Sequence, residues 1–140
     1  MLNIKEWLVT KIMNDSVLKV TLAGPNNTVN IFPMDIDIQP EQFPCITYGV
    51  VGMTVLSVPR GMHIGTMSLS IWSKENSLEC ENIYTQLAKI FNFKDSTTET
   101  FNGTLWWFRE ERVNDMHQAN RKIWHKVVDF KVWANNTDNS

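Results

Sequence analysis

The sequence predicts an α+β fold, in which a mainly antiparallel, twisted β-sheet packs against an N-terminal helix and one central helix. Residues 64–72 alternate between apolar and polar side chains, as in a strand with one face on a core. Residues 76–93 follow with apolar side chains at helical spacing, so this strand leads directly into a helix. Runs of strands on both sides of one helix are typical of α+β proteins.

The central helix has a start signal and one apolar stripe. Asn76 stands three residues before Glu79, which predicts a capping box, and Lys89 and Lys94 lie towards the C-terminal end, where positive charge suits the helix dipole. The stripe that we expect to face the sheet consists of Cys80, Ile83, Tyr84, Leu87 and Phe91.

The N-terminal part predicts a second helix followed by a shorter helical segment. Asn3 and Glu6 again have capping-box spacing, and residues 14–16 break or kink the helix before a short segment over residues 17–22. Residues 24–27 are a strong turn signal. The stripe of the first helix consists of Ile4, Trp7, Leu8 and Ile12.

The remaining segments before the central helix predict strands. A short strand over residues 29–33 ends at a proline, and residues 34–44 form a loop that leads into a buried strand over residues 45–51. Residues 53–62 are apolar and end in a turn, as in the near arm of a hairpin whose far arm starts at Ile64.

Two further strands are expected after the central helix. The first covers residues 98–112 and is split by a bulge or tight turn at Asn102-Gly103. A connection over residues 114–120 leads to the last strand, residues 122–133, which is partly apolar on both faces. Residues 1–134 then form a single domain, and residues 135–140 a frayed tail.

The composition narrows the classes of function. An apolar content of 43% with 20% charged residues is ordinary for a soluble protein, and no apolar run approaches the ~20 residues of a membrane helix. The start of the chain lacks the pattern of a signal peptide, and two cysteines in unlike settings suit a reducing cytoplasm. A net charge of −2 argues against a protein that binds nucleic acid mainly through contacts to the phosphate backbone.

The charge is unevenly distributed along the chain. No Lys or Arg occurs between Lys19 and Arg60, whereas residues 109–131 hold six basic residues against four acidic ones. This polarity suits stacking on a partner, although a loosely mixed surface is the preferred explanation.

No residue pattern predicts a catalytic, cofactor or metal site. His63, His117 and His125 lack metal-ligand spacing to one another or to a cysteine. Cys80 lies on the apolar helix stripe as a small core residue. Cys45 is interpreted as a core residue too, and it is the better candidate of the two for a reactive thiol. An enzyme whose site is assembled from distant residues stays open.

Apolar residues on both faces of the last strands point to self-association. The cluster Trp106-Trp107-Phe108 before Arg109 invites a base-stacking interpretation, but the alternation of these rings between two faces favours a core or a subunit interface. Exposed apolar surface usually marks a protein contact. The expected subunit interface consists of Trp107, Val113, Ile123, Val127 and Trp133.

Five segments of the chain form an ordered pattern. They are Asp15-Ser16-Val17-Leu18, Ile31-Phe32-Pro33, Phe43-Pro44-Cys45-Ile46, Met67-Ser68-Leu69-Ser70-Ile71-Trp72-Ser73 and His125-Lys126-Val127-Val128-Asp129-Phe130. Through the order of these segments the chain resembles the small tail-completion, or tail-terminator, proteins of long-tailed bacteriophages. A long connection over residues 52–64 and the Trp-rich residues 105–108 depart from that pattern.

This resemblance implies a structural virion protein, assembled in the host cytoplasm, that forms a ring, typically a hexamer, on the end of the tail tube. The ring would join the tube to the head-side connector and let DNA pass without specific binding. The resemblance implies no catalytic residue, no cofactor, no metal and no membrane. The docking loops implied for tube or neck carry Asp35, Asp37, Glu41, Val55, Leu56, Val58 and Arg60.

Two alternatives remain at this stage. One is another neck or tail subunit, such as a head-completion or tube protein, although a tube subunit would need longer uninterrupted strands. The other is a small nucleic-acid- or ligand-binding α+β module, which would use Trp106, Phe108, Arg109 and Arg112.

Overall fold

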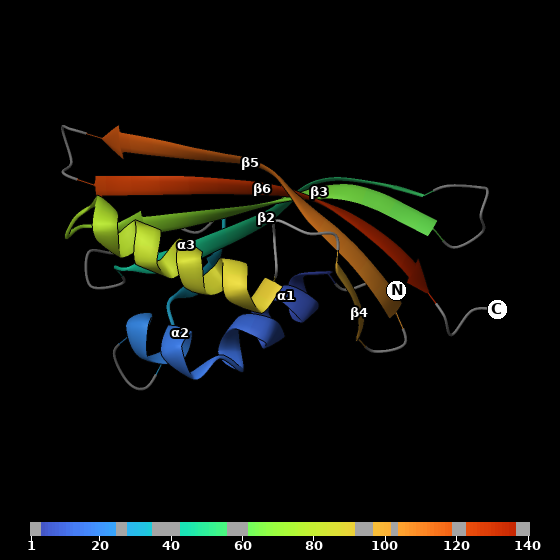
Figure 1. Ribbon diagram of the computed structural model, residues 1–140, viewed down its shortest axis with the longest axis horizontal. Helices are drawn as coiled ribbons and strands as arrows, with labels where there is room; N and C mark the ends of the chain where they lie inside the picture. The colour runs from blue at the N-terminus through green and yellow to red at the C-terminus, as the bar shows by residue number, and fades with distance from the viewer. Residues whose placement is uncertain are drawn as a thin grey trace.

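The computed structural model of the chain describes residues 4–24, 28–34, 43–55, 62–91, 97–101, 104–118 and 123–136. A six-stranded sheet forms one layer, and three helices form the other (Figure 1). This arrangement confirms the predicted α+β class, with a sheet that is antiparallel except where its first two strands pair.

The strands follow the order β1-β2-β3-β6-β5-β4 across the sheet. The last two strands in the sequence, β5 and β6, are long and pair with each other, and β6 lies beside β3 in the middle of the sheet. The bounds are β1 Ile31–Pro33, β2 Cys45–Val55, β3 Met62–Ser73, β4 Thr97–Phe101, β5 Thr104–Gln118 and β6 Ile123–Asn136.

All three described helices lie on the same side of the sheet (Figure 1). They are α1 (Ile4–Met13), α2 (Ser16–Thr21) and α3 (Ser77–Phe91), and α2 is the short helical segment expected after the first helix. The core lies between the two layers, where the stripe of α3 packs on the inward-facing positions of β3 and β6 and the buried side chains of α1 pack against α3 and β2. Its largest buried side chains are Trp7, Phe91, Phe130, Leu8, Ile12, Leu18, Leu22, Ile46 and Met67.

The start of α3 differs in detail from the predicted capping box. The Asn76 side chain accepts a hydrogen bond from the Glu79 backbone N–H at 2.8 Å, as a cap should. The Glu79 carboxylate, however, accepts from the buried Ser73 hydroxyl at 2.7 Å, and the same hydroxyl oxygen accepts from the Asn76 backbone N–H at 3.4 Å. Ser73 at the end of β3 therefore lies between the Glu79 carboxylate and the Asn76 backbone N–H, which would bond directly in a capping box.

Several strand boundaries differ from the sequence-based expectation. Residues 53–55 continue β2 and pair antiparallel with β3, as the predicted near arm of a hairpin should, and β5 runs on to Gln118 through residues assigned to a connection. Strand pairing explains both extensions, because each added residue has a cross-strand partner, as Asp115 has in Lys126. Asn135 and Asn136 belong to β6 rather than to the tail, whereas the split at residues 102–103 does separate β4 from β5.

Two irregularities of register lie beside one transverse row of the sheet. The row joins Val50, Met67, Phe130 and Glu110 across four neighbouring strands, and the ladder shifts by one residue next to Val50 and next to Glu110. Such bulges bend a strand and increase its twist. Figure 1 shows the sheet turning at its middle, so that one half covers the helices and the other half projects beyond them. Among the described residues, no helix is long and apolar enough to span a membrane.

Candidate interaction surfaces

The sheet face that points away from the helices is called the outer face here. Strand alternation assigns its positions, because Met67, Leu69 and Ile71 of β3 face the core and their neighbours in sequence point the other way. Cross-strand pairing extends the assignment to β2, β5 and β6. The outer positions of β3 and β6 are Ile64, Thr66, Ser68, Ser70, Trp72, Ile123, His125, Val127, Asp129, Lys131 and Trp133.

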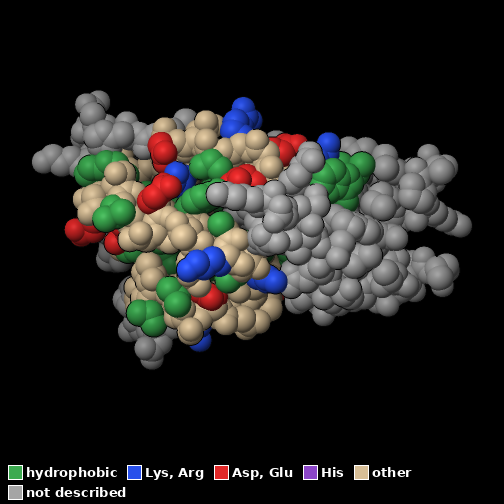
Figure 2. Space-filling model, in the orientation of Figure 1, with side chains coloured by type: hydrophobic (Ala, Val, Ile, Leu, Met, Phe, Trp, Pro, Cys, Tyr) green, Lys and Arg blue, Asp and Glu red, His purple; other side chains and the backbone are tan. Residues whose placement is uncertain are grey.

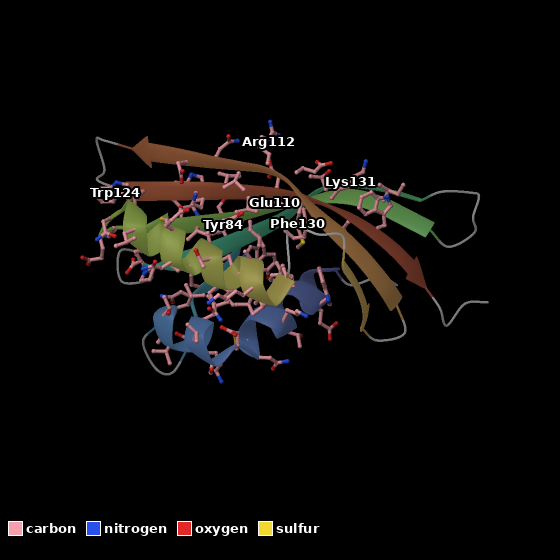
Figure 3. All side chains as sticks on the ribbon, in the orientation of Figure 1. Tyr84, Glu110, Arg112, Trp124, Phe130 and Lys131 are labelled. Atoms are coloured by element: carbon pink, nitrogen blue, oxygen red, sulfur yellow. The ribbon has the colours of Figure 1, made fainter. Side chains whose placement is uncertain are left out.

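The projecting half of the outer face carries an aromatic and basic group. Trp133 pairs with Ile64 on one side and with Trp107 on the other, and both Trp133 and Ile64 are partly exposed. The Lys131 ammonium lies 5.5 Å from the centre of the Trp133 ring, within the range of a cation–π contact. In Figure 3, Lys131 points away from the helical layer, as Arg112 does. A partner here would meet apolar area beside positive charge.

The middle of the outer face is polar. Arg112 of β5 reaches Asp129 of β6 at 3.4 Å, but the Arg112 side chain is 68% exposed, so water weakens this ion pair. Beside Asp129, β3 presents only the small side chains of Ser68 and Ser70. On β2, a side chain at Gly49 would begin 2.7 Å from the Met34 sulfur, so glycine allows Met34 to lie against the sheet.

Two stacked rings, those of Trp72 and His125, lie at the end of the outer face near the start of β6. Trp72 and His125 are parallel, with ring centres 3.6 Å apart, and the Trp72 indole N–H donates to the Thr47 hydroxyl at 3.0 Å. Burial lowers the pKa of His125 to about 4, and its Nε2 is a buried atom without a hydrogen-bond partner in the described part of the chain. The histidine is therefore neutral at physiological pH.

A charged cluster lies on the helical side, at the edge between α3 and β5. Lys126 is buried, and its ammonium contacts Glu81 at 2.7 Å and Asp115 at 2.9 Å. Burial alone would lower the pKa of Lys126, but the hydrogen bonds and charges of these two carboxylates outweigh it and raise the pKa. Tyr84 donates a short hydrogen bond to Glu110 beside this group, and burial together with that bond raises the pKa of the phenol (Figure 3). These paired groups fasten α3 to the sheet.

Both cysteines are buried free thiols. Burial raises the pKa of Cys45 to about 12 and that of Cys80 to about 11, so neither is a thiolate at physiological pH. The Cys80 sulfur lies within weak hydrogen-bond distance of the Ile71 and Trp124 carbonyl oxygens, as expected for a core residue. Among the described residues, no group of three or more His, Cys, Asp and Glu side chains could hold a metal ion.

The five residues expected at a subunit interface do not share one face. Trp133, Val127, Ile123 and Trp107 occupy outer positions, although the Trp107 side chain lies outside the described part. Val113 instead pairs with Val128 and packs against the core below α3, so it does not belong to the outer surface.

The other expected sites are only partly covered by the structure. Val55 ends β2, and its side chain is not described; the remaining docking-loop residues, Asp35, Asp37, Glu41, Leu56, Val58 and Arg60, lie outside the described residues. The four residues of the nucleic-acid interpretation divide between the faces. Trp106 and Phe108 occupy helix-side positions, whereas Arg109 and Arg112 occupy outer ones.

Comparison with known proteins finds a likeness in structure. No family model and no curated protein matches the sequence. A chain in the solved virion of a native gene transfer agent (GTA) particle is similar in fold, with a TM-score of 0.66 over 91% of each chain and 8% sequence identity. At that identity the likeness shows a shared fold.

Proposed function

We propose that this chain is a structural virion protein, and within that class a tail terminator that closes the tail tube with a ring. The observation that carries the proposal is the likeness in fold to a virion chain over 91% of both proteins. The ordered segments that resemble tail-terminator proteins agree with it and supply the finer assignment.

The distribution of apolar groups supports self-assembly. The residues of the core cluster are buried between sheet and helices, whereas Trp133 and Ile64 are partly exposed on the outer face, where the sheet projects beyond the helices. Exposed aromatic area on a rigid strand is typical of a protein interface. A second copy of the chain, the tail tube and the head-side connector are the partners of this proposal.

A passive DNA channel fits the charges better than a nucleic-acid-binding site. The chain has a net charge of −2, and of the residues in the nucleic-acid interpretation, Trp106 and Phe108 occupy helix-side positions whereas Arg109 and Arg112 occupy outer ones. DNA would therefore pass through the ring without specific contacts, and no chemistry on it is proposed.

The native mass of the protein tests this function. Light scattering over a range of protein concentrations and at two salt levels should give a mass near six times 16.2 kDa, and electron microscopy should show single rings with a central channel. A protein that keeps the mass of one subunit at every concentration would contradict the self-assembling ring.

The second candidate is another neck or tail subunit, because the likeness to a virion chain fits any position in the particle. The same micrographs distinguish the two. Rings that stack into tubes would identify a tube subunit, whereas rings that stay single support a terminator.

A further inference from the structure

The molecule carries two surface patches of opposite charge, each with an apolar centre; the first is exposed and the second is partly exposed. The helix patch lies at the start of α3, where Leu78 is 63% exposed and stands three residues from Glu75 and from Glu81. Residues three apart on a helix are neighbours on its surface, so Leu78 and Glu81 lie side by side. The sheet patch lies on the outer face and consists of Lys131, Trp133 and Ile64.

The two patches of one molecule cannot meet each other. The helix patch is on the helical side, at the end of the molecule where β3 enters α3, and the sheet patch is on the opposite face of the projecting half (Figure 1). Figure 2 shows acidic and hydrophobic side chains over the left end of the molecule and a hydrophobic patch beside a Lys or Arg side chain on the right.

We infer that the helix patch of one copy docks on the sheet patch of the next, with Leu78 against Trp133 and the carboxylates beside Lys131. This inference rests on the proposed self-assembly and specifies its contact. Charge complementarity supports it, because Lys131 has no carboxylate partner among the described side chains, and Glu75 and Glu81 remain exposed.

A contact of this kind is head-to-tail and therefore repeats around a ring. It joins different surfaces of the two copies. Repetition of such a contact produces a closed ring when the rotation between neighbouring copies brings the last copy back to the first. A two-fold contact between two sheet patches would bring the lysines of both copies towards each other, and like charges oppose it.

Cysteine pairing tests the contact directly. Leu78→Cys and Lys131→Cys are prepared separately and joined with a short bis-maleimide, against the low background expected from the buried Cys45 and Cys80. We expect cross-linked dimers only when the two variants are mixed, and a ladder of multimers when both changes are in one chain. Val20→Cys in place of Leu78→Cys is the matched control, because Val20 is 79% exposed on α2 and lies outside both patches.

Exchange of charges gives a second and independent readout. Glu75→Lys and Lys131→Glu should each weaken assembly at least tenfold, and the chain with both changes should recover most of the loss, because the pair is then restored with its signs reversed. Glu75 is chosen over Glu81 because Glu81 also holds the buried Lys126.

Each outcome decides between the contact and the ring. Cross-linking by Lys131→Cys alone indicates a two-fold contact and overturns the inference. Wild-type rings with no response to either test overturn the contact and leave the ring proposal standing. A wild-type protein that never assembles overturns the ring proposal, and the contact with it.

Discussion

Lys126 shows how one buried charge can fasten an element without adding much stability of its own. Its ammonium is enclosed, whereas the side chains of its partners Glu81 and Asp115 are 53% and 75% exposed. Lys126→Met should therefore change the free energy of unfolding by less than about 1 kcal/mol, because both carboxylates can be hydrated. Glu81→Gln with Asp115→Asn should cost about 3 kcal/mol, because a buried ammonium then has no counter-ion. Urea denaturation measures both, and a larger loss for Lys126→Met would refute this account.

The pH dependence of Lys126 follows from its raised pKa. A base whose pKa is higher in the folded state than its ordinary 10.5 contributes stability that is complete below pH 10.5. That contribution is lost as the pH rises through the folded pKa. Wild type should thus lose stability above pH 10.5 relative to Lys126→Met, as urea denaturation over a series of pH values would measure.

His125 should make the fold sensitive to mild acid. Its pKa is about 4 in the folded chain and 6.5 ordinarily, so the unfolded chain binds the proton more readily between these values. The contribution of neutral His125 to the free energy of unfolding is complete above pH 6.5, and it is lost as the pH falls towards 4. His125→Phe keeps a ring against Trp72 but cannot titrate, so its Tm should fall less than that of wild type over this range. Equal slopes in thermal melts would show that His125 does not carry the effect.

The helix start at Asn76 can be tested at the scale of the element. Asn76→Ala removes the side chain that accepts from the Glu79 N–H and should cost about 1 kcal/mol, and Asn76→Ser should restore most of it. Asn82→Ala is the matched control, because Asn82 is exposed within the same helix, where alanine is neutral or slightly stabilising. Chemical denaturation of the three variants measures the difference. If Asn76→Ala costs nothing, the Ser73–Glu79 hydrogen bond alone sets the start of α3.

Helices and strands whose apolar residues recur at a regular spacing could be predicted from the sequence. The residues at which these elements begin and end could not. The stripe of α3 and the alternation in β3 were read from the residues, because a period of 3.6 or 2 reports which face meets the core. The extension of β5 through Asn114 to Gln118 was missed, because polar residues in a strand carry no such signal. These residues are held in the ladder by pairing with β6 and by the Asp115–Lys126 ion pair.

To predict which side chains lie on the outer face, the register of strand pairing is needed as well as the alternation of the residues. Val113 and Trp107 are six residues apart on β5, so alternation alone would put them on one face, and no residue pattern predicts that a bulge next to Glu110 separates them. One extra residue changes which face the following side chains take, so Val113 meets the core while Trp107 occupies an outer position. The pairing of Lys131 with the Trp133 ring could have been suspected from their spacing of two on one strand.

At the scale of the whole molecule, β6 separates folding from assembly. Phe130 is fully buried between β6 and α3, and Trp133 stands three residues further on the opposite face, partly exposed. Trp133→Asp should therefore leave the Tm nearly unchanged and lower the native mass, because the lost contact lies between subunits. Phe130→Asp should cost more than about 4 kcal/mol and prevent folding, because it places a charge in the core.

The two variants are compared by thermal melts and light scattering on the same samples. A Trp133→Asp protein that unfolds like Phe130→Asp would place Trp133 in the core of the isolated subunit and remove the physical argument for assembly through the outer face. A protein that melts as wild type but no longer forms rings would show that one strand serves two tasks: its inward side chains hold the subunit together, and its outward ones hold the ring. The alternation of a β-strand, combined with a sheet that outreaches its helices, is sufficient for that division.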